Sequence, residues 1–181
     1  MNEKQQVRIS KFLSLVLRHK PGTIGLELDE NGWTDTNELL EKMSQNGKSI
    51  DFEQLNIVVE NNPKKRFAFN EDKTRIRANQ GHSIKIDLGF EPQQPPEILY
   101  HGTGTKYLES ILEQGLKKQK RHHVHLSADK ETATKVGQRH GKLAMLEVAT
   151  ITMYQDGYKF YLSENGVWLT DEVPIEYLRQ L

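Results

Sequence analysis

The sequence predicts an α+β protein built from two lobes. Apolar residues recur at helical spacing in the first third of the chain, whereas short runs with strand-like alternation dominate after residue 97. Between these regions lies the polar, proline-rich stretch "FEPQQPPEIL" at 90–99, a composition typical of connectors. We therefore place a boundary that gives lobes of residues 1–91 and 92–181.

The first lobe is expected to begin with an amphipathic helix. Its apolar residues recur every three to four positions between residues 9 and 17, and Ser10 is a possible N-terminal cap. Pro21 limits the helix because proline lacks an amide donor. Arg18 and His19 therefore fall in its last turn.

The rest of this lobe contains two more helices and a hairpin. Asp51 and Gln54 are spaced for a capping box at the start of the third helix. The expected elements are a turn at 29–33, helices at 34–43 and 51–62, and two strands around a polar turn at 66–78. Three helices followed by a hairpin are typical of a winged helix.

The second lobe alternates short strands with helices. We expect strands at 97–103, 123–127 and 142–148, helices at 106–115 and 129–141, and a tight hairpin at 160–170. Gly115 closes the first of these helices. No GxGxxG motif follows the first strand and no GxxxxGK[ST] motif occurs, so neither a Rossmann nor a P-loop nucleotide site is predicted.

Composition excludes several classes of function. The chain has 25 Lys and Arg against 25 Asp and Glu, so any anion site must be local rather than the product of a global field. There is no cysteine, which excludes disulfides and thiolate metal sites. The start lacks the apolar core of a signal peptide, and the longest mostly apolar run, Phe12 to Leu17, is too short to span a bilayer. We expect a cytoplasmic protein with no membrane partner.

Three basic clusters are candidate anion sites. They are Arg18 with His19, the "KKRF" stretch at 64–67, and the "KKQKRHH" stretch at 117–123. Each alone also fits an ordinary explanation: cations at the negative end of a helix dipole, an edge strand protected by charge, or a solvated surface run. Individually, none of the three decides the function.

The histidines raise the question of a metal. In a strand over 123–127, His123, His125 and Ser127 share one face, and His101 lies in the "YHGTGT" stretch. A zinc site using His101, His123 and His125 is conceivable, but there are no cysteines and no HExxH helix. We therefore expect no metal.

Taken together, the motifs resemble those of one family, the NAD-dependent RNA 2′-phosphotransferases, called KptA in bacteria. The resemblance covers nearly the whole chain and depends on seven blocks in one order. They are "SKFLSLVLRHKP" at 10, "DENGW" at 29, "KKRF" at 64, "RIRANQGHS" at 75, "LYHGT" at 99, "RHHVHLSAD" at 121 and "ENGVWLTDEVP" at 164.

The resemblance implies a fold and a reaction. The first lobe would be winged-helix-like and bind RNA and phosphate, and the second would have an ADP-ribosyltransferase-like fold and bind NAD. The RNA 2′-phosphate would attack the nicotinamide ribose and expel nicotinamide, giving an RNA-2′-phospho-ADP-ribose intermediate. The ribose 2″-hydroxyl would then attack phosphorus, giving 2′-hydroxyl RNA and ADP-ribose 1″,2″-cyclic phosphate.

By the same resemblance, residues can be assigned to roles. The family's catalytic tetrad falls on Arg18, His19, Arg66 and Arg121, and its cofactor elements fall on His101, Gly102, Thr103, His125, Leu126 and Ser127. Val167 stands where many ADP-ribosyltransferases have a glutamate, a departure that this family shares. The block Gln80 to Ser83 matches the family without an assignable role, and we expect it to be a loop joining the lobes. A monomer is expected.

Two alternatives remain open. One is an ADP-ribosyltransferase that acts on the phosphate ends of nucleic acids and stops after the first step. The other is a non-catalytic winged-helix protein that binds nucleic acid, which leaves the "LYHGT" and "RHHVHLSAD" blocks unexplained. The natural RNA cannot be named from the sequence.

Overall fold

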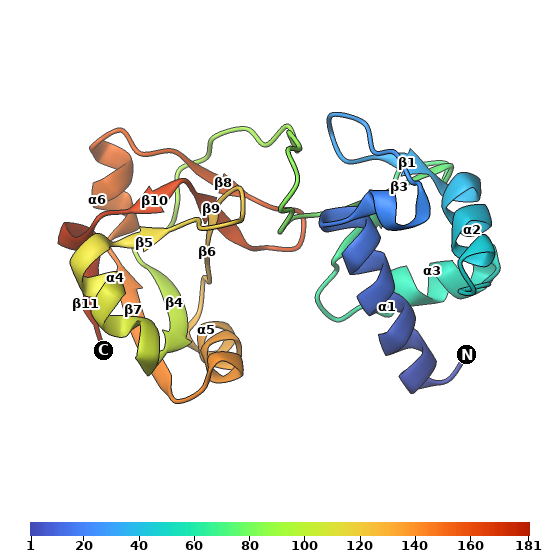
Figure 1. The fold of residues 1–181 in the computed structure, drawn as a ribbon. Coiled ribbons are helices and arrows are strands. Elements are labelled where there is room, and N and C mark those ends of the chain that lie inside the picture. The colour runs from blue at the N-terminus through green and yellow to red at the C-terminus, as the bar shows by residue number, and fades with distance from the viewer. The chain divides into compact units, whose positions relative to one another are not determined.

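The computed structural model describes residues 1–181 and contains two compact units, Met1–Gly89 and Phe90–Leu181 (Figure 1). Each unit has its own apolar core. Six α-helices and several small sheets make up the chain, so the expected mixture of helices and strands is confirmed. The units divide after residue 89, whereas the sequence placed the boundary after residue 91.

Helix α1 (Glu3–Arg18) is longer than the sequence predicts. Ser10 does not cap it, because the cap is Asn2, whose side chain accepts from the main chain of Gln5 at 2.9 Å. The Gln5 side chain returns a bond to the main chain of Asn2, which completes a capping box. The first turns of α1 are polar and exposed, so apolar periodicity does not mark them.

Two further helices complete the helical part of the N-terminal unit. Helix α2 (Thr36–Gln45) is capped by Asp35 and begins two residues later than expected. Helix α3 (Phe52–Glu60) begins with the predicted capping box, in which Asp51 and Gln54 exchange bonds of 2.8 and 3.2 Å. A short 3-10 helix (Pro21–Ile24) follows α1.

A three-stranded antiparallel sheet packs with these helices. The strands are β1 (Thr34–Asp35), β2 (Phe67–Phe69) and β3 (Arg75–Ala78), in the order β1-β3-β2. The predicted hairpin is therefore confirmed as β2 and β3, whereas β1 is too short to show a pattern in the sequence. Leucines and isoleucines from α1, α2, α3 and β3 fill the core; its completely buried members include Leu13, Leu17, Leu39, Leu55 and Ile76.

The C-terminal unit is built from short antiparallel sheets. One has the order β11-β7-β4, formed by Leu178–Gln180, Leu143–Val148 and Leu99–Gly104. A second has the order β6-β9-β8, formed by Val124–Leu126, Trp168–Thr170 and Phe160–Leu162. A third pairs β10 (Glu172–Val173) with β5 (Leu116–Lys117). The predicted hairpin at 160–170 is confirmed as β8 and β9.

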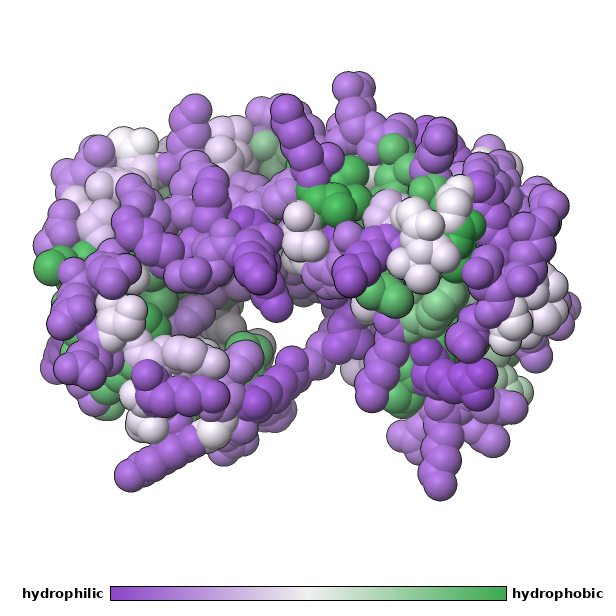
Figure 2. Space-filling model, in the orientation of Figure 1, coloured by the Kyte–Doolittle hydropathy of each residue, from purple (hydrophilic) through white to green (hydrophobic).

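Three helices belong to this unit: α4 (Leu108–Gln114), α5 (Lys130–Gly137) and α6 (Thr150–Gln155). Helix α4 ends at Gly115, as predicted. The expected helix at 129–141 is α-helical only to Gly137 and continues as a 3-10 turn, Gln138–His140. None of the helices is long and apolar enough to cross a bilayer. On the face drawn in Figure 2, hydrophilic residues predominate and hydrophobic residues form separate patches.

Two glycines allow α5 to lie directly against β4. A Cβ atom on Gly102 would stand 1.8 Å from the carbonyl oxygen of Ala133, and one on Gly137 would stand 2.8 Å from the carbonyl carbon of Gly102. The clashing atoms belong to the main chains of α5 and β4, so relieving either clash would require the helix to move away from the strand. The fold therefore requires a residue without a side chain at position 102.

We predict that Gly102→Ala destabilises the protein strongly, by about 3 kcal/mol or more, because the new methyl group collides with backbone rather than with a flexible side chain. Chemical denaturation of both proteins measures the change in the free energy of unfolding. Gly22→Ala is the matched control, since a Cβ there has no atom within 4 Å. Equal stability of the two variants would contradict the prediction.

Candidate active site

Three basic residues lie at the end of helix α1 and directly before strand β2: Arg18, His19 and Arg66, called the α1–β2 basic cluster below. Arg18 is the last residue of α1, and His19 is its C-terminal cap. The Arg18 side chain donates from Nη2 to the main-chain carbonyl of Arg66 at 3.3 Å, and its guanidinium carbon lies 5.9 Å from the centre of the Phe67 ring. The first two basic clusters of the sequence are thus brought together.

The segment that follows β3 is hydrogen-bonded to the main chain of this cluster. Asn79 donates from its main chain to the carbonyl of Arg66 at 2.9 Å and from Nδ2 to the carbonyl of Lys65 at 2.6 Å. Four residues later, Ser83 lies beside His19. The block with no assignable role therefore belongs to the N-terminal unit and contacts the end of α1, rather than only joining the lobes.

In the C-terminal unit, β4 and the "HVHLS" segment lie side by side. Tyr100 and Ser127 exchange two main-chain hydrogen bonds, of 2.9 and 2.8 Å, in an antiparallel bridge. This pairing places Nδ1 of His101 at 3.1 Å from the carbonyl oxygen of His125. Because a carbonyl only accepts, Nδ1 of His101 carries a hydrogen, and Nε2 of the neutral ring is left as an acceptor.

The charge state of His101 follows from its surroundings. Burial lowers the pKa of His101 below its ordinary value, and the hydrogen bond to the carbonyl of His125 only partly offsets this effect. His140 lowers the pKa further through charge repulsion. Burial and the neighbouring His140 therefore favour the neutral ring.

Arg121 joins this second group of residues. Its Nη1 lies 3.2 Å from Nδ1 of His125, and because a guanidinium only donates, Nδ1 of His125 is the acceptor. The hydrogen of the neutral His125 ring is then on Nε2. Arg121, His125 and His101 thus form a linked set at the edge where β4 meets β6.

A family model described as "RNA 2′-phosphotransferase, Tpt1 / KptA family" matches residues 4–172. The chain belongs to this family. It is 62% identical over 178 residues to a "Probable RNA 2′-phosphotransferase" of Flavobacterium johnsoniae, with 98% of each chain covered. A protein with the same description from Fusobacterium nucleatum is 58% identical, and the match covers 96% of this chain and 97% of that protein. Another, from Trichormus variabilis, is 52% identical, and the match covers 100% of both chains.

The tetrad that the RNA 2′-phosphotransferase family suggests is divided between the two units. Arg18, His19 and Arg66 form the α1–β2 basic cluster, and Arg121 is part of the C-terminal unit. Among the suggested cofactor residues, Thr103 is 5% exposed and Leu126 is 1% exposed. The Leu126 side chain belongs to the core, so a ligand contact by this residue would use its main chain.

Within each unit, no three histidine or carboxylate side chains are placed to hold a metal ion. The His123 ring lies near that of Tyr161, with ring centres 5.4 Å apart and ring planes tilted by 58°. Val167 lies in the turn between β8 and β9, where its main chain exchanges hydrogen bonds with Ser163.

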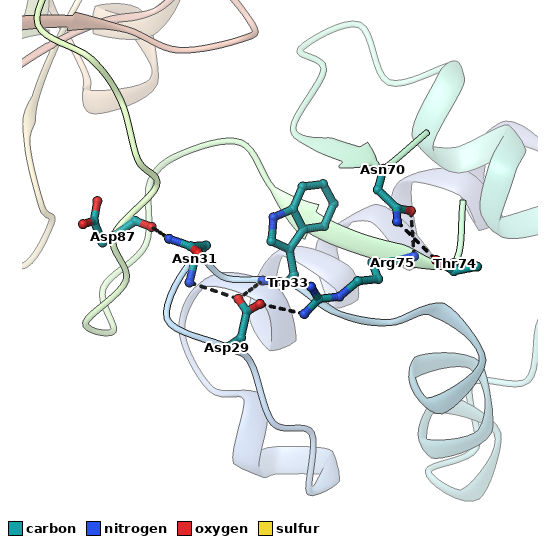
Figure 3. Close-up of polar contacts among 7 residues, drawn as sticks. All are labelled: Asp29, Asn31, Trp33, Asn70, Thr74, Arg75 and Asp87. Atoms are coloured by element: carbon teal, nitrogen blue, oxygen red, sulfur yellow. Dashed lines mark hydrogen bonds and ion pairs between the residues drawn. The ribbon is translucent and has the colours of Figure 1, made fainter. Parts of the chain in front are cut away.

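The "DENGW" block has a role that the sequence analysis did not assign. Asp29 accepts from the main chains of Asn31 and Trp33 at 3.0 and 2.8 Å and pairs with Nη2 of Arg75 at 2.6 Å (Figure 3). The Arg77 guanidinium carbon lies 4.6 Å from the centre of the Trp33 ring. The loop therefore secures strand β3, which leads directly into the segment that contacts the α1–β2 basic cluster.

These contacts also set the charge of Asp29. Burial alone would raise its pKa, but hydrogen bonds from the main chain of Trp33 and the side chain of Arg75 outweigh burial and lower the pKa below its usual value. The carboxylate is thus stabilised in its charged form. Asp29 contributes stability above its unfolded-state pKa and loses this contribution as the pH falls through the lower, folded-state value.

We predict that Asp29→Asn lowers the free energy of unfolding at pH 7 by about 1 kcal/mol, because the amide cannot pair with Arg75 and the pair is partly exposed. The difference from the unsubstituted protein should shrink as the pH falls toward 3. Urea denaturation over this pH range measures it. Glu71→Gln, which removes an exposed carboxylate of the β2–β3 turn, is the control and should change stability little.

Proposed function

We propose that this protein removes an internal 2′-phosphate from RNA by transferring it to NAD. The membership in the RNA 2′-phosphotransferase family supports the reaction class. The observation that carries the proposal is that residues suited to bind a phosphate are grouped by contacts in the N-terminal unit, and residues suited to bind a ribose are grouped in the C-terminal unit.

In this proposal, the N-terminal unit is a winged-helix-like lobe for RNA and phosphate. Its three helices and its β1-β3-β2 sheet are compatible with that fold. Arg18, His19 and Arg66 would hold the 2′-phosphate, with Arg121 as the fourth contact. Guanidinium groups suit this task because their planar fork matches phosphate oxygens. The bond from Arg18 to Arg66 is accepted by a neutral main-chain carbonyl rather than by a carboxylate.

The C-terminal unit would be the ADP-ribosyltransferase-like lobe that takes NAD as a substrate. Nε2 of His101 is suited to accept a hydrogen bond from a ribose hydroxyl, because Nδ1 already carries the ring hydrogen. Ser127, held next to Tyr100, would contact the same ribose, and the main chain of Gly102 would contact the carboxamide. Thr103, His125 and Leu126 would complete this site.

The proposed reaction has two steps. An oxygen of the 2′-phosphate attacks C1″ of the nicotinamide ribose, and the bond from C1″ to nicotinamide breaks. The 2″-hydroxyl then attacks phosphorus and loses its proton, and the RNA 2′-oxygen leaves and gains one. The phosphate is already an anionic nucleophile, so the first step needs no carboxylate base, which agrees with an apolar residue at Val167.

The first test uses an oligoribonucleotide with one internal 2′-phosphate, incubated with and without NAD. We expect conversion to the 2′-hydroxyl product only with NAD, with one nicotinamide released per phosphate removed. Release of inorganic phosphate without NAD would contradict the proposal. Binding of RNA with no turnover of NAD would instead favour the non-catalytic alternative.

We further predict that Arg18→Ala, His19→Ala, Arg66→Ala and Arg121→Ala each accumulate RNA-2′-phospho-ADP-ribose. The second step passes through a phosphorane whose charge is concentrated on the oxygens that these residues would bind. Loss of one contact that stabilises this transition state by about 2 to 4 kcal/mol slows the step roughly thirty- to a thousand-fold. The intermediate appears as a slower band in a denaturing gel. Ser127→Ala is the comparison, because it should slow formation of the intermediate instead.

A further inference from the structure

The segment Asn79–Ser83 makes a set of contacts that the proposed reaction has not used. His19 has an exposed side chain at the end of α1, beyond the last helical residue, where the helix itself does not fix its ring. Ser83 contacts this helix end twice. Its main-chain N–H donates to the carbonyl of Arg18 at 2.9 Å, and its Oγ lies 2.9 Å from Nδ1 of His19.

The first of these contacts locates Ser83 relative to the helix. The carbonyl of Arg18 is one of the last in α1, and such carbonyls have no partner within their own helix. Ser83 therefore acts as a cap supplied from a distant part of the chain. Its hydroxyl is thereby held within reach of the ring on the next residue.

The rest of the segment is firmly anchored. Asn79, at its start, is 4% exposed and donates to the carbonyls of Lys65 and Arg66. His82, directly before Ser83, is 1% exposed. The main-chain bond to α1 and the buried neighbour His82 therefore restrict where the Ser83 hydroxyl can lie.

We propose that Ser83 is a positioning residue for His19, a role that rests on the proposed function. By donating to Nδ1, its hydroxyl orients the ring and leaves the ring hydrogen on Nε2, the atom that would meet the phosphate. A hydroxyl can donate to Nδ1 of the neutral ring and, after rotation, accept from Nδ1 of the charged ring. In both states Nε2 is a donor, as a group that binds a phosphate oxygen or protonates a leaving oxygen must be.

The choice of serine is chemically specific. A carboxylate or a carbonyl at this place can only accept, so it favours the tautomer with hydrogen on Nδ1 and removes the hydrogen from Nε2 of the neutral ring. The carbonyl of His125 has that effect on His101. A hydroxyl can donate instead, so it is compatible with the opposite tautomer at His19.

The experiment compares Ser83→Ala with Ser83→Thr in the assay with the 2′-phosphorylated oligoribonucleotide and NAD. We expect Ser83→Ala to slow the second step roughly tenfold and accumulate the intermediate, with little change in KM for the RNA, because the ring loses its orientation but every phosphate ligand remains. Ser83→Thr retains the hydroxyl at an exposed position and should keep the unsubstituted rate. Ser110→Ala, at an exposed site in α4, is the control for loss of a serine hydroxyl.

A double-mutant cycle shows whether the effect passes through His19. In a His19→Ala background, Ser83→Ala should have no further effect on the second step. Equal losses in both backgrounds would overturn the proposal, as would equal losses in Ser83→Ala and Ser83→Thr. Thermal unfolding should be unchanged in Ser83→Ala, because the main-chain bond to Arg18 remains; a large fall in the unfolding temperature would mean a structural role and also overturn it.

A measurement without activity separates this proposal from the proposed function. Nitrogen NMR at pH 8.5 reports which ring nitrogen of His19 carries the hydrogen. We expect the Nε2–H tautomer in the unsubstituted protein and in Ser83→Thr, and a mixture closer to that of free histidine in Ser83→Ala. If the protein shows this pattern but has no NAD-dependent activity, the proposed function is wrong, while the proposal that Ser83 orients His19 is supported. If the three proteins have the same tautomer ratio, the proposal for Ser83 fails whatever the activity.

Discussion

The carbonyl oxygen of Arg66 is the acceptor on which the basic cluster of the N-terminal unit depends. It receives Nη2 of Arg18 from the end of α1 and the main-chain N–H of Asn79 from the segment after β3. A hydrogen bond from a charged donor contributes about 1.5 to 3 kcal/mol, which is sufficient to orient a long side chain that otherwise has many rotamers. Because the acceptor is a neutral main-chain group, this contact orients the guanidinium without forming an ion pair.

Main-chain acceptors recur at the other groups of interest. The carbonyl of His125 fixes the tautomer of His101, and the carbonyl of Arg18 fixes Ser83 beside His19. Each acceptor lies at the end of a helix or at a strand pairing, where the backbone has one definite position. The positions of these acceptors therefore come from secondary structure that packing has already fixed, and the groups that bind them are oriented from it.

The sequence predicts those elements whose signal is local. The capping box of Asp51 and Gln54, the β2–β3 hairpin and the Gly115 stop each depend on residues close together in the chain, and all three are confirmed. The errors have the same explanation. The start of α1 was missed because its cap precedes a polar stretch, and β1, β5 and β10 are two-residue strands, too short for any alternation.

The candidate site shows the same limit more sharply. His19 and Ser83 are 64 residues apart, and the distance between them depends on the packing of β3 against α1, which no local pattern encodes. The sequence could mark Arg18, His19 and Arg66 only as separate basic clusters, each with an ordinary explanation. Their grouping within the N-terminal unit is visible only in the structure. The assignment of these residues to a phosphate remains a prediction until the reaction is measured.

Packing also decides which motif residues carry information about function. Gly102 must lack a side chain because Ala133 lies against it, and Leu126 and Thr103 are buried, so the fold would retain all three in the absence of any ligand. The side chains of His101 and Arg121 are different, since His101 is only partly buried and Arg121 is exposed. Core packing alone does not require an imidazole or a guanidinium at those positions. The case for a ribose and phosphate site in the C-terminal unit therefore depends on these two side chains, and the glycine of the "HGT" motif adds little to it.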